Sequence, residues 1–152
     1  MKIILTTFLL FVNLLAYQKG DTISSEMALR LSLDNHKIYI VDFFASWCSS
    51  CQKELPLISH VNEKIDKTKV EIIGIDVDKK VESAMAFQES LRKRDNLDFR
   101  VINDSQNFII SKFNPIGMPT LFYIKNRKII TIVTGAVDNI DVKILNDLNE
   151  ME

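Results

Sequence analysis

The chain contains only two cysteines, Cys48 and Cys51, which are separated by two serines. Residues three apart on the first turn of a helix point the same way, so these thiols can close a small-loop disulfide and open again to a dithiol. Backbone N–H groups at a helix N-terminus favour negative charge, so we expect Cys48 to ionise readily and to attack first. We expect Cys51, one turn further in, to be shielded and to react second.

Other uses of a cysteine pair fit the sequence less well. A zinc site would need more ligands, but there is no second cysteine pair, and His36 and His60 stand at spacings that match no zinc finger. Haem attachment needs a histidine directly after the second cysteine, where this chain has Gln52. A purely structural disulfide across so short a loop would remove little entropy from the unfolded chain. The pair therefore predicts redox chemistry, and the sequence assigns no metal and no cofactor.

The cysteines follow an apolar run, Ile38 to Phe44, and open a helical pattern that extends to about Ile65. The run is apolar on both alternations, which is typical of a central strand covered on both faces. Asp42 interrupts it and is expected to be buried. Burial raises the pKa of a carboxyl group towards that of a thiol, so Asp42 is a candidate to take the proton from Cys51 when a mixed disulfide resolves.

The rest of the chain alternates helical and extended patterns, as in an α/β domain. A second β-branched run, Val70 to Val77, completes a βαβ unit whose crossover should be right-handed. Further helices are expected over Thr22 to Leu33, Asp78 to Asn96, Ser105 to Phe113 and from Asp138 onward, and further strands over Leu97 to Asn103, Thr120 to Ile124 and Lys128 to Val133. In the helix from Asp78, the spacing predicts that Val81, Met85 and Leu91 point inward. Ser105 is the expected cap of the helix that follows.

The composition and the N-terminal segment indicate where in the cell the protein acts. The 152 residues allow one domain, and 19 basic against 20 acidic residues give no electrostatic case for nucleic acid. Residues 3–16 are mostly apolar, shorter than the roughly 20 residues of a spanning helix and similar in length to a signal-peptide core. We therefore predict that residues 1–20 are a signal peptide or an N-terminal membrane anchor, that residues 21–152 form the folded domain, and that this domain lies outside the cytoplasm.

Several motifs resemble those of one family. The segment from Val41 to Cys51, Pro56, the segment Gly117-Met118-Pro119-Thr120 and Gly135 occur in the order and at the distances seen in thioredoxin. Cys51-Gln52-Lys53-Glu54-Leu55-Pro56 looks like the Cys-x-x-Glu-x-Pro signature of the exported TlpA/ResA-like reductases. The helix expected over Asp78 to Asn96 is similar to the insertion that those proteins carry.

The resemblance implies a thioredoxin-like α/β fold, with a central mixed sheet flanked by helices and one helical insertion before the half that holds a cis-proline. It also implies a cis peptide bond between Met118 and Pro119, although from the sequence alone Pro119 could equally be an ordinary turn proline. Trp47, Met118, Pro119 and Thr120 would then bind the substrate chain. The implied partners are disulfide-containing proteins and a membrane-borne electron donor for re-reduction, with the protein acting as a monomer.

The sequence also departs from the family in places. Ser49-Ser50 lacks the proline common in these reductases, and Thr120 stands where the cytochrome c maturation branch usually has glutamate. TlpA-like proteins often have asparagine in place of Asp42, and the strand from Val70 to Val77 lacks the lysine that would partner this acid in thioredoxin.

The first hypothesis is therefore an exported protein-disulfide reductase, in cytochrome c maturation or in general periplasmic thiol reduction. A dithiol oxidase on the same fold differs only in its redox equilibrium. A non-enzymatic chaperone for copper or another soft metal would use both thiolates and a third ligand, for which His36 and His60 are the only imidazoles.

Overall fold

A computed structural model describes residues 16–151, so most of the predicted signal or anchor segment lies outside the described residues. Five strands form one mixed sheet in the order β3-β2-β1-β4-β5. The strands are β1 Ile38–Phe44, β2 Val70–Asp76, β3 Arg100–Asn103, β4 Thr120–Lys125 and β5 Lys128–Thr134. β1 and β2 pair in parallel, as do β2 and β3, whereas β4 runs antiparallel to β1 and β5. The predicted α/β class with a mixed sheet is confirmed.

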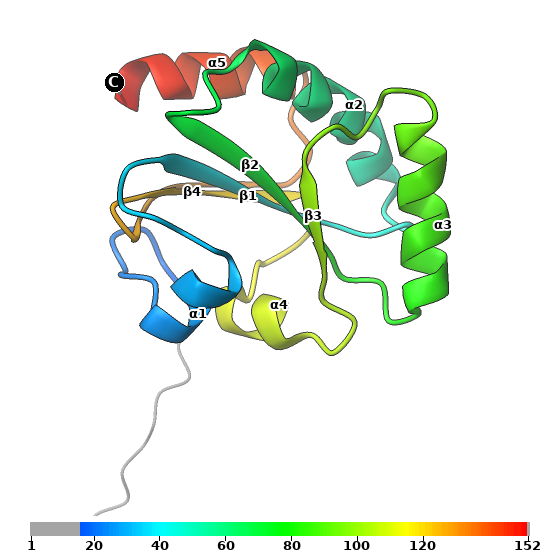
Figure 1. The fold of residues 1–152 in the computed structure, drawn as a ribbon, viewed down its shortest axis with the longest axis horizontal. Coiled ribbons are helices and arrows are strands. Elements are labelled where there is room, and N and C mark those ends of the chain that lie inside the picture. Colours follow the sequence, from blue (N-terminus) through cyan, green and yellow to red (C-terminus); the bar gives the residue numbers. More distant parts are fainter. Residues whose placement is uncertain (1–15, 152) are drawn as a thin grey trace, which may run out of the picture.

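Helices cover both faces of this sheet. They are α1 Ser25–Arg30, α2 Ser49–Lys64, α3 Val81–Arg92, α4 Phe108–Phe113 and α5 Ile140–Met151. Figure 1 shows α2 and α5 above the sheet and α1 and α4 below it, with α3 beside the edge strand β3. α2 and α5 also pack against each other. Among residues 16–151, no helix combines the length and apolar character needed to cross a membrane.

The central strand β1 is buried along its whole length, as its apolar pattern predicted. On one side, the rings of Phe43, Phe113 and Phe122 pack with centroids 4.9 to 5.7 Å apart. On the neighbouring strand, Gly74 leaves room for the ring of Phe44, because a Cβ at position 74 would lie 2.7 Å from that ring. β1, the strand that leads to the cysteines, is therefore closely packed next to both of its neighbouring strands, β2 and β4.

Two local predictions are wrong. Val81 and Met85 are 39% and 59% exposed, and the buried residues of α3 are Ala84 and Leu91. Because α3 lies against the edge of the sheet, only a narrow stripe of it is covered (Figure 1). The helix expected to begin at Ser105 begins at Phe108.

The N-terminus of α4 is held by an acid that precedes Ser105. The carboxylate of Asp104 accepts hydrogen bonds from the backbone N–H groups of Ile109, at 3.0 Å, and Ile110, at 2.8 Å. Asn107, the residue before the helix, has a φ of 57° and no capping bond from its side chain. The buried carboxylate of Asp104, the residue after β3, therefore caps the helix, and not the predicted Ser105.

The hairpin and the last helix follow the prediction. β4 and β5 are joined at Asn126 and Arg127, both of which have positive φ values of 52° and 60°, as a tight two-residue turn requires. The predicted inward face of α5, with Ile140, Ile144 and Leu148, is buried. That α3 is an insertion relative to the family stays a prediction.

Candidate active site

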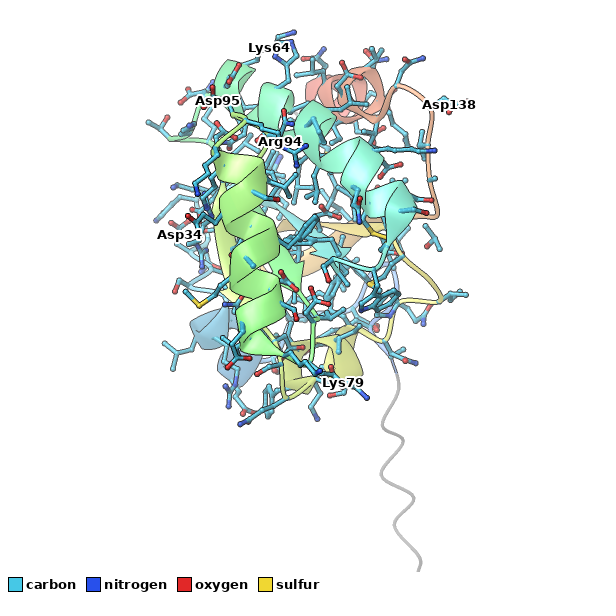
Figure 2. All side chains as sticks on the ribbon, turned by 90° about the vertical axis from the view of Figure 1, so that its right-hand side faces the viewer. Asp34, Lys64, Lys79, Arg94, Asp95 and Asp138 are labelled. Carbon is cyan, nitrogen blue, oxygen red and sulfur yellow. A yellow bond between two sulfur atoms is a disulfide. The ribbon has the colours of Figure 1, made fainter. Side chains whose placement is uncertain are left out.

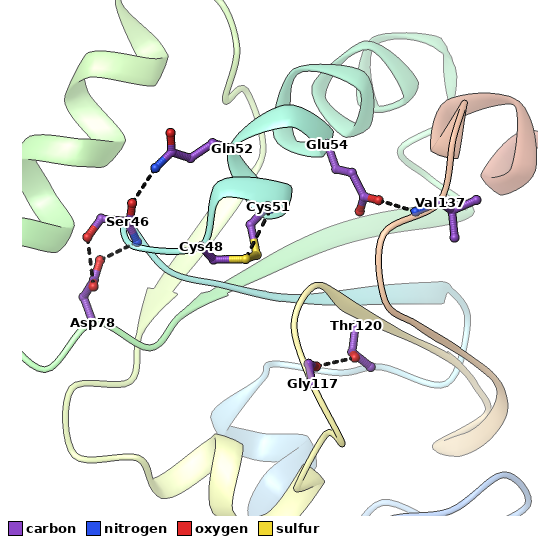
Figure 3. The surroundings of a disulfide bond; sticks show 9 residues. All are labelled: Ser46, Cys48, Cys51, Gln52, Glu54, Asp78, Gly117, Thr120 and Val137. Atoms are coloured by element: carbon purple, nitrogen blue, oxygen red, sulfur yellow. Dashed lines mark hydrogen bonds between the residues drawn. A yellow bond between two sulfur atoms is a disulfide. The ribbon is translucent and has the colours of Figure 1, made fainter.

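A disulfide joins Cys48 and Cys51 where the loop after β1 enters α2 (Figure 3). The two Cα atoms are 5.3 Å apart. Cys48 is the N-cap residue of α2, and its Sγ accepts a hydrogen bond from the backbone N–H of Cys51 at 3.2 Å. Cys48 is 8% exposed and Cys51 is 1% exposed. The first sulfur therefore lies nearer to solvent, at the positive end of a helix dipole, and the second lies inside.

This arrangement favours ionisation of Cys48 once the disulfide opens. A thiolate at the N-cap gains a charge-assisted hydrogen bond from the N–H of Cys51 and the field of the helix terminus. Cys51, by contrast, is buried, and burial favours the neutral thiol. The geometry thus supplies one sulfur at the helix N-terminus, where a thiolate is stabilised, and one sulfur buried behind it.

Asp42 lies in the middle of β1, opposite Gly74 of β2 and Leu121 of β4. Its side chain is buried, and its Oδ1 has no hydrogen-bond partner. Burial raises the pKa of Asp42 from its ordinary 3.8 to about 8, and the nearby negative charge of Glu54 adds to the effect. At neutral pH this carboxyl group is mostly protonated, and its pKa is close to that of a thiol.

Glu54 is a second buried acid, for which no chemical role was predicted from the sequence. Its Oε1 accepts a hydrogen bond of 2.7 Å from the backbone N–H of Val137, while its Oε2 has no partner (Figure 3). Burial raises the pKa of Glu54, and the bond from Val137 opposes that rise. The burial of Glu54 beside the cysteine pair could have been predicted from its spacing, because Glu54 follows the buried Cys51 by three residues and shares its face of α2.

The loop before the disulfide is held by hydrogen bonds to its neighbours. The backbone N–H and the hydroxyl of Ser46 donate to the two carboxylate oxygens of Asp78, at 2.9 and 3.0 Å. The amide of Gln52, on α2, donates to the carbonyl oxygen of Ser46 at 2.5 Å. Between these anchored residues, Trp47 projects from the protein and is 67% exposed. A large ring is therefore presented beside Cys48 on a fixed backbone.

The segment that leads into β4 lies on another side of the disulfide (Figure 3). The peptide bond between Met118 and Pro119 is cis. The carbonyl oxygen of Pro119 accepts a hydrogen bond from the N–H of Gly135 at 2.9 Å, and the hydroxyl of Thr120 donates to the carbonyl oxygen of Gly117 at 2.6 Å. The side chain of Thr120 is fully buried. Of the predicted substrate-binding residues, only Trp47 has a largely exposed side chain.

The two histidines lie on exposed positions. His36 is in the turn before β1, and His60 is on α2, where its Nδ1 lies 3.5 Å from a carboxylate oxygen of Glu63. Within residues 16–151, no group of three or more histidine, cysteine, aspartate or glutamate side chains is arranged to hold a metal ion.

Comparison with known proteins agrees with this geometry. The family model described as thioredoxin-like matches residues 35–130. Thiol-disulfide oxidoreductase ResA of Geobacillus kaustophilus is 30% identical over 115 residues, which are 75% of this chain and 64% of that protein. ResA of Bacillus subtilis is 26% identical over 98 residues, which are 64% of this chain and 52% of that protein. The chain thus spans less than two thirds of the length of these relatives.

Solved structures show the same fold at lower identity. A secreted disulfide oxidoreductase of Mycobacterium tuberculosis, described as homologous to DsbE of Escherichia coli, superposes with a TM-score of 0.62 and 24% identity over 76% of this chain and 85% of that chain. A thiol:disulfide interchange protein of Chlorobium tepidum gives 0.63 and 20%, over 88% and 97% of the two chains.

Proposed function

Because the chain belongs to the thioredoxin-like family, we propose that it is a thiol-disulfide oxidoreductase that reduces disulfides of exported proteins through Cys48 and Cys51. The observation that carries the proposal is the position of Cys48 at the N-cap of α2, where its sulfur accepts the N–H of Cys51 and is the more exposed of the pair. The names of the ResA relatives support the same reaction.

In the first step, the thiolate of Cys48 attacks one sulfur of a substrate disulfide. A bond forms between Cys48 and that sulfur, and the other substrate sulfur leaves as a thiolate. The exposed ring of Trp47 belongs to the residue before Cys48, and the segment from Gly117 to Thr120 lies near the disulfide (Figure 3). We assign to Trp47 and to the backbone of Met118 and Pro119 the contacts with the substrate chain. Pro119 has no N–H that could compete with an extended substrate chain for a backbone partner.

In the second step, Cys51 loses its proton and attacks the sulfur of Cys48. The mixed disulfide breaks, the second substrate sulfur leaves as a thiolate, and the bond between Cys48 and Cys51 forms. The substrate has gained two electrons and the protein has lost two. We assign the proton from Cys51 to the ionised form of Asp42, which is about a tenth of the molecules at pH 7 for a pKa of about 8. Because this pKa is close to that of a thiol, transfer of the proton between the two groups costs little.

Trapping tests this sequence. In a Cys51→Ser protein the second step is blocked, so mixed disulfides through Cys48 should accumulate with substrate proteins and should disappear on treatment with a reductant. A Cys48→Ser protein is the matched control, because its remaining sulfur is 1% exposed and should trap far less. Failure of the Cys51→Ser protein to form any mixed disulfide would remove the proposed activity.

The direction of electron flow is tested by equilibrium with glutathione. A reduction potential close to that of thioredoxin, about −270 mV, supports a reductase, whereas a value near −120 mV identifies a dithiol oxidase on the same fold. As a reductase, the protein needs a dithiol donor at the membrane to restore Cys48 and Cys51. Export, through the predicted signal or anchor in residues 1–20, and a monomeric state belong to the same proposal, and fractionation of cells and sedimentation test them.

A further inference from the structure

A groove of about 470 Å³ opens beside the loop residues Ser46 and Trp47, which precede Cys48. It lies between the loop that precedes Cys48 and the start of α3. Its wall includes Ser46, Trp47, Val77, Lys79, Lys80 and Ser83. Trp47 immediately precedes Cys48, so the groove borders the residue next to the attacking cysteine.

The outer wall of the groove is positively charged. Lys79 and Lys80 are both exposed, and neither has a salt-bridge partner among the residues that the structure describes. Asp78 also borders the groove, but both of its carboxylate oxygens accept hydrogen bonds from Ser46 and the side chain is buried. The carboxylate of Asp78 is thus bound within the protein, and the side chains of Lys79 (Figure 2) and Lys80 are exposed.

We propose that this groove binds an acidic stretch of the substrate polypeptide next to its reactive cysteine. The inference rests on the proposed function and adds a class of substrate to it. Apolar atoms of the substrate would pack on Trp47, and its carboxylates would pair with Lys79 and Lys80. The protein as a whole carries a net charge of −1, so its overall charge would not attract an acidic chain. Any preference for acidic segments must come from this local pair.

Two peptide disulfides test the preference. Each peptide has one cysteine linked to thionitrobenzoate, and the cysteine is flanked by aspartates in one peptide and by asparagines in the other. Attack by Cys48 places the peptide on Cys48 and releases coloured thionitrobenzoate, and attack by Cys51 then releases the peptide thiol and closes the disulfide. Exposed ion pairs typically change an equilibrium by about one and a half to five times each, so two pairs of about threefold each should make the aspartate peptide react about tenfold faster at low salt. High salt should bring the ratio close to one.

Charge reversal locates the effect. In Lys79→Glu/Lys80→Glu, the ratio of the two rates should fall to one or below. Lys64→Glu/Lys67→Glu changes the net charge equally at exposed positions, and Figure 2 shows Lys64 and Lys79 at opposite ends of the molecule. This control should keep the wild-type ratio.

The outcomes separate the two proposals. Equal rates for the two peptides with the wild-type protein would overturn acidic docking and leave the oxidoreductase activity intact. The same loss of preference in both double variants would also overturn it, because the effect would then be one of overall charge. Release of no thionitrobenzoate from either peptide by the reduced wild-type protein would refute the activity itself.

Discussion

Replacing Asp42 by asparagine should make the oxidised protein less sensitive to alkaline pH. The unfolded chain releases the Asp42 proton near pH 3.8, while the native protein holds it until about pH 8. Between these values the native state binds one more proton than the unfolded state. The contribution of Asp42 to the free energy of unfolding is therefore fully present below pH 3.8 and is lost as the pH rises through about 8.

The size of the effect follows from the two pKa values. Each pH unit in this window lowers the free energy of unfolding by about 1.4 kcal/mol. From pH 5 to pH 8 the loss is about 3.6 kcal/mol, once partial ionisation near pH 8 is allowed for. Domains of this kind have a free energy of unfolding of about 5 to 15 kcal/mol, so the change is easily measured. An amide at position 42 cannot titrate and should abolish this slope.

Urea unfolding of the oxidised proteins at pH 5 and pH 8 measures the effect. The difference in unfolding free energy, Asp42→Asn minus wild type, should be about 3.6 kcal/mol more favourable to the variant at pH 8 than at pH 5. Any fixed cost of burying the amide cancels in this comparison. Asp95→Asn, which removes an exposed carboxylate near the end of α3, is the matched control for the change of charge. If the two differences for Asp42→Asn are the same, the carboxyl group is ionised in the native protein and its assignment as a proton acceptor of raised pKa is wrong.

Three other substitutions test the packing and the second acid. Gly74→Ala should lower the free energy of unfolding by about 2 kcal/mol because its methyl group meets the ring of Phe44, and Phe44→Leu in the same chain should restore part of the loss in a double-mutant cycle. Ile144→Ala should cost about 2 to 5 kcal/mol in urea unfolding, since the side chain is fully buried between α5 and the sheet; a smaller loss would show that α5 packs loosely. Glu54→Gln should lower the midpoint at which Asp42 titrates, observed by NMR of its carboxyl carbon, because it removes the negative charge that raises this pKa; an unchanged midpoint would leave burial as the only cause.

The parts of the fold that the sequence predicted well are those in which one physical signal dominates. β1 and β2 are apolar on both alternations, and strands of this kind have few stable places other than the centre of a sheet. The cysteine pair could be placed for a similar reason, since its chemistry depends on three-residue spacing at a helix start. The burial of Asp42 followed from its position within β1, without any knowledge of its neighbours.

The wrong predictions concern contacts that depend on how distant elements meet. The inward face of α3 could not be found from periodicity, because the helix lies against a sheet edge and buries Ala84 where a stripe through Met85 was expected. The cap of α4 comes from Asp104, five residues upstream of the first amide that it binds, beyond the spacing of ordinary capping rules. The hydrogen bond that Glu54 accepts also depends on a distant element, because the loop before α5 brings the N–H of Val137 to its carboxylate.

The raised pKa of Asp42 gives the proposed cycle a consistent path for one proton. In the oxidised protein the carboxyl group is mostly protonated at neutral pH, which is the state expected directly after Cys51 has given up its proton and closed the disulfide. When a donor thiolate later attacks Cys48, Cys51 leaves as a buried thiolate, and an apolar environment makes that charge costly. A neutral acid in the same core can return the proton at that moment. The same property that lowers the stability of the protein at alkaline pH therefore lets Asp42 act as a base in one half of the cycle and as an acid in the other.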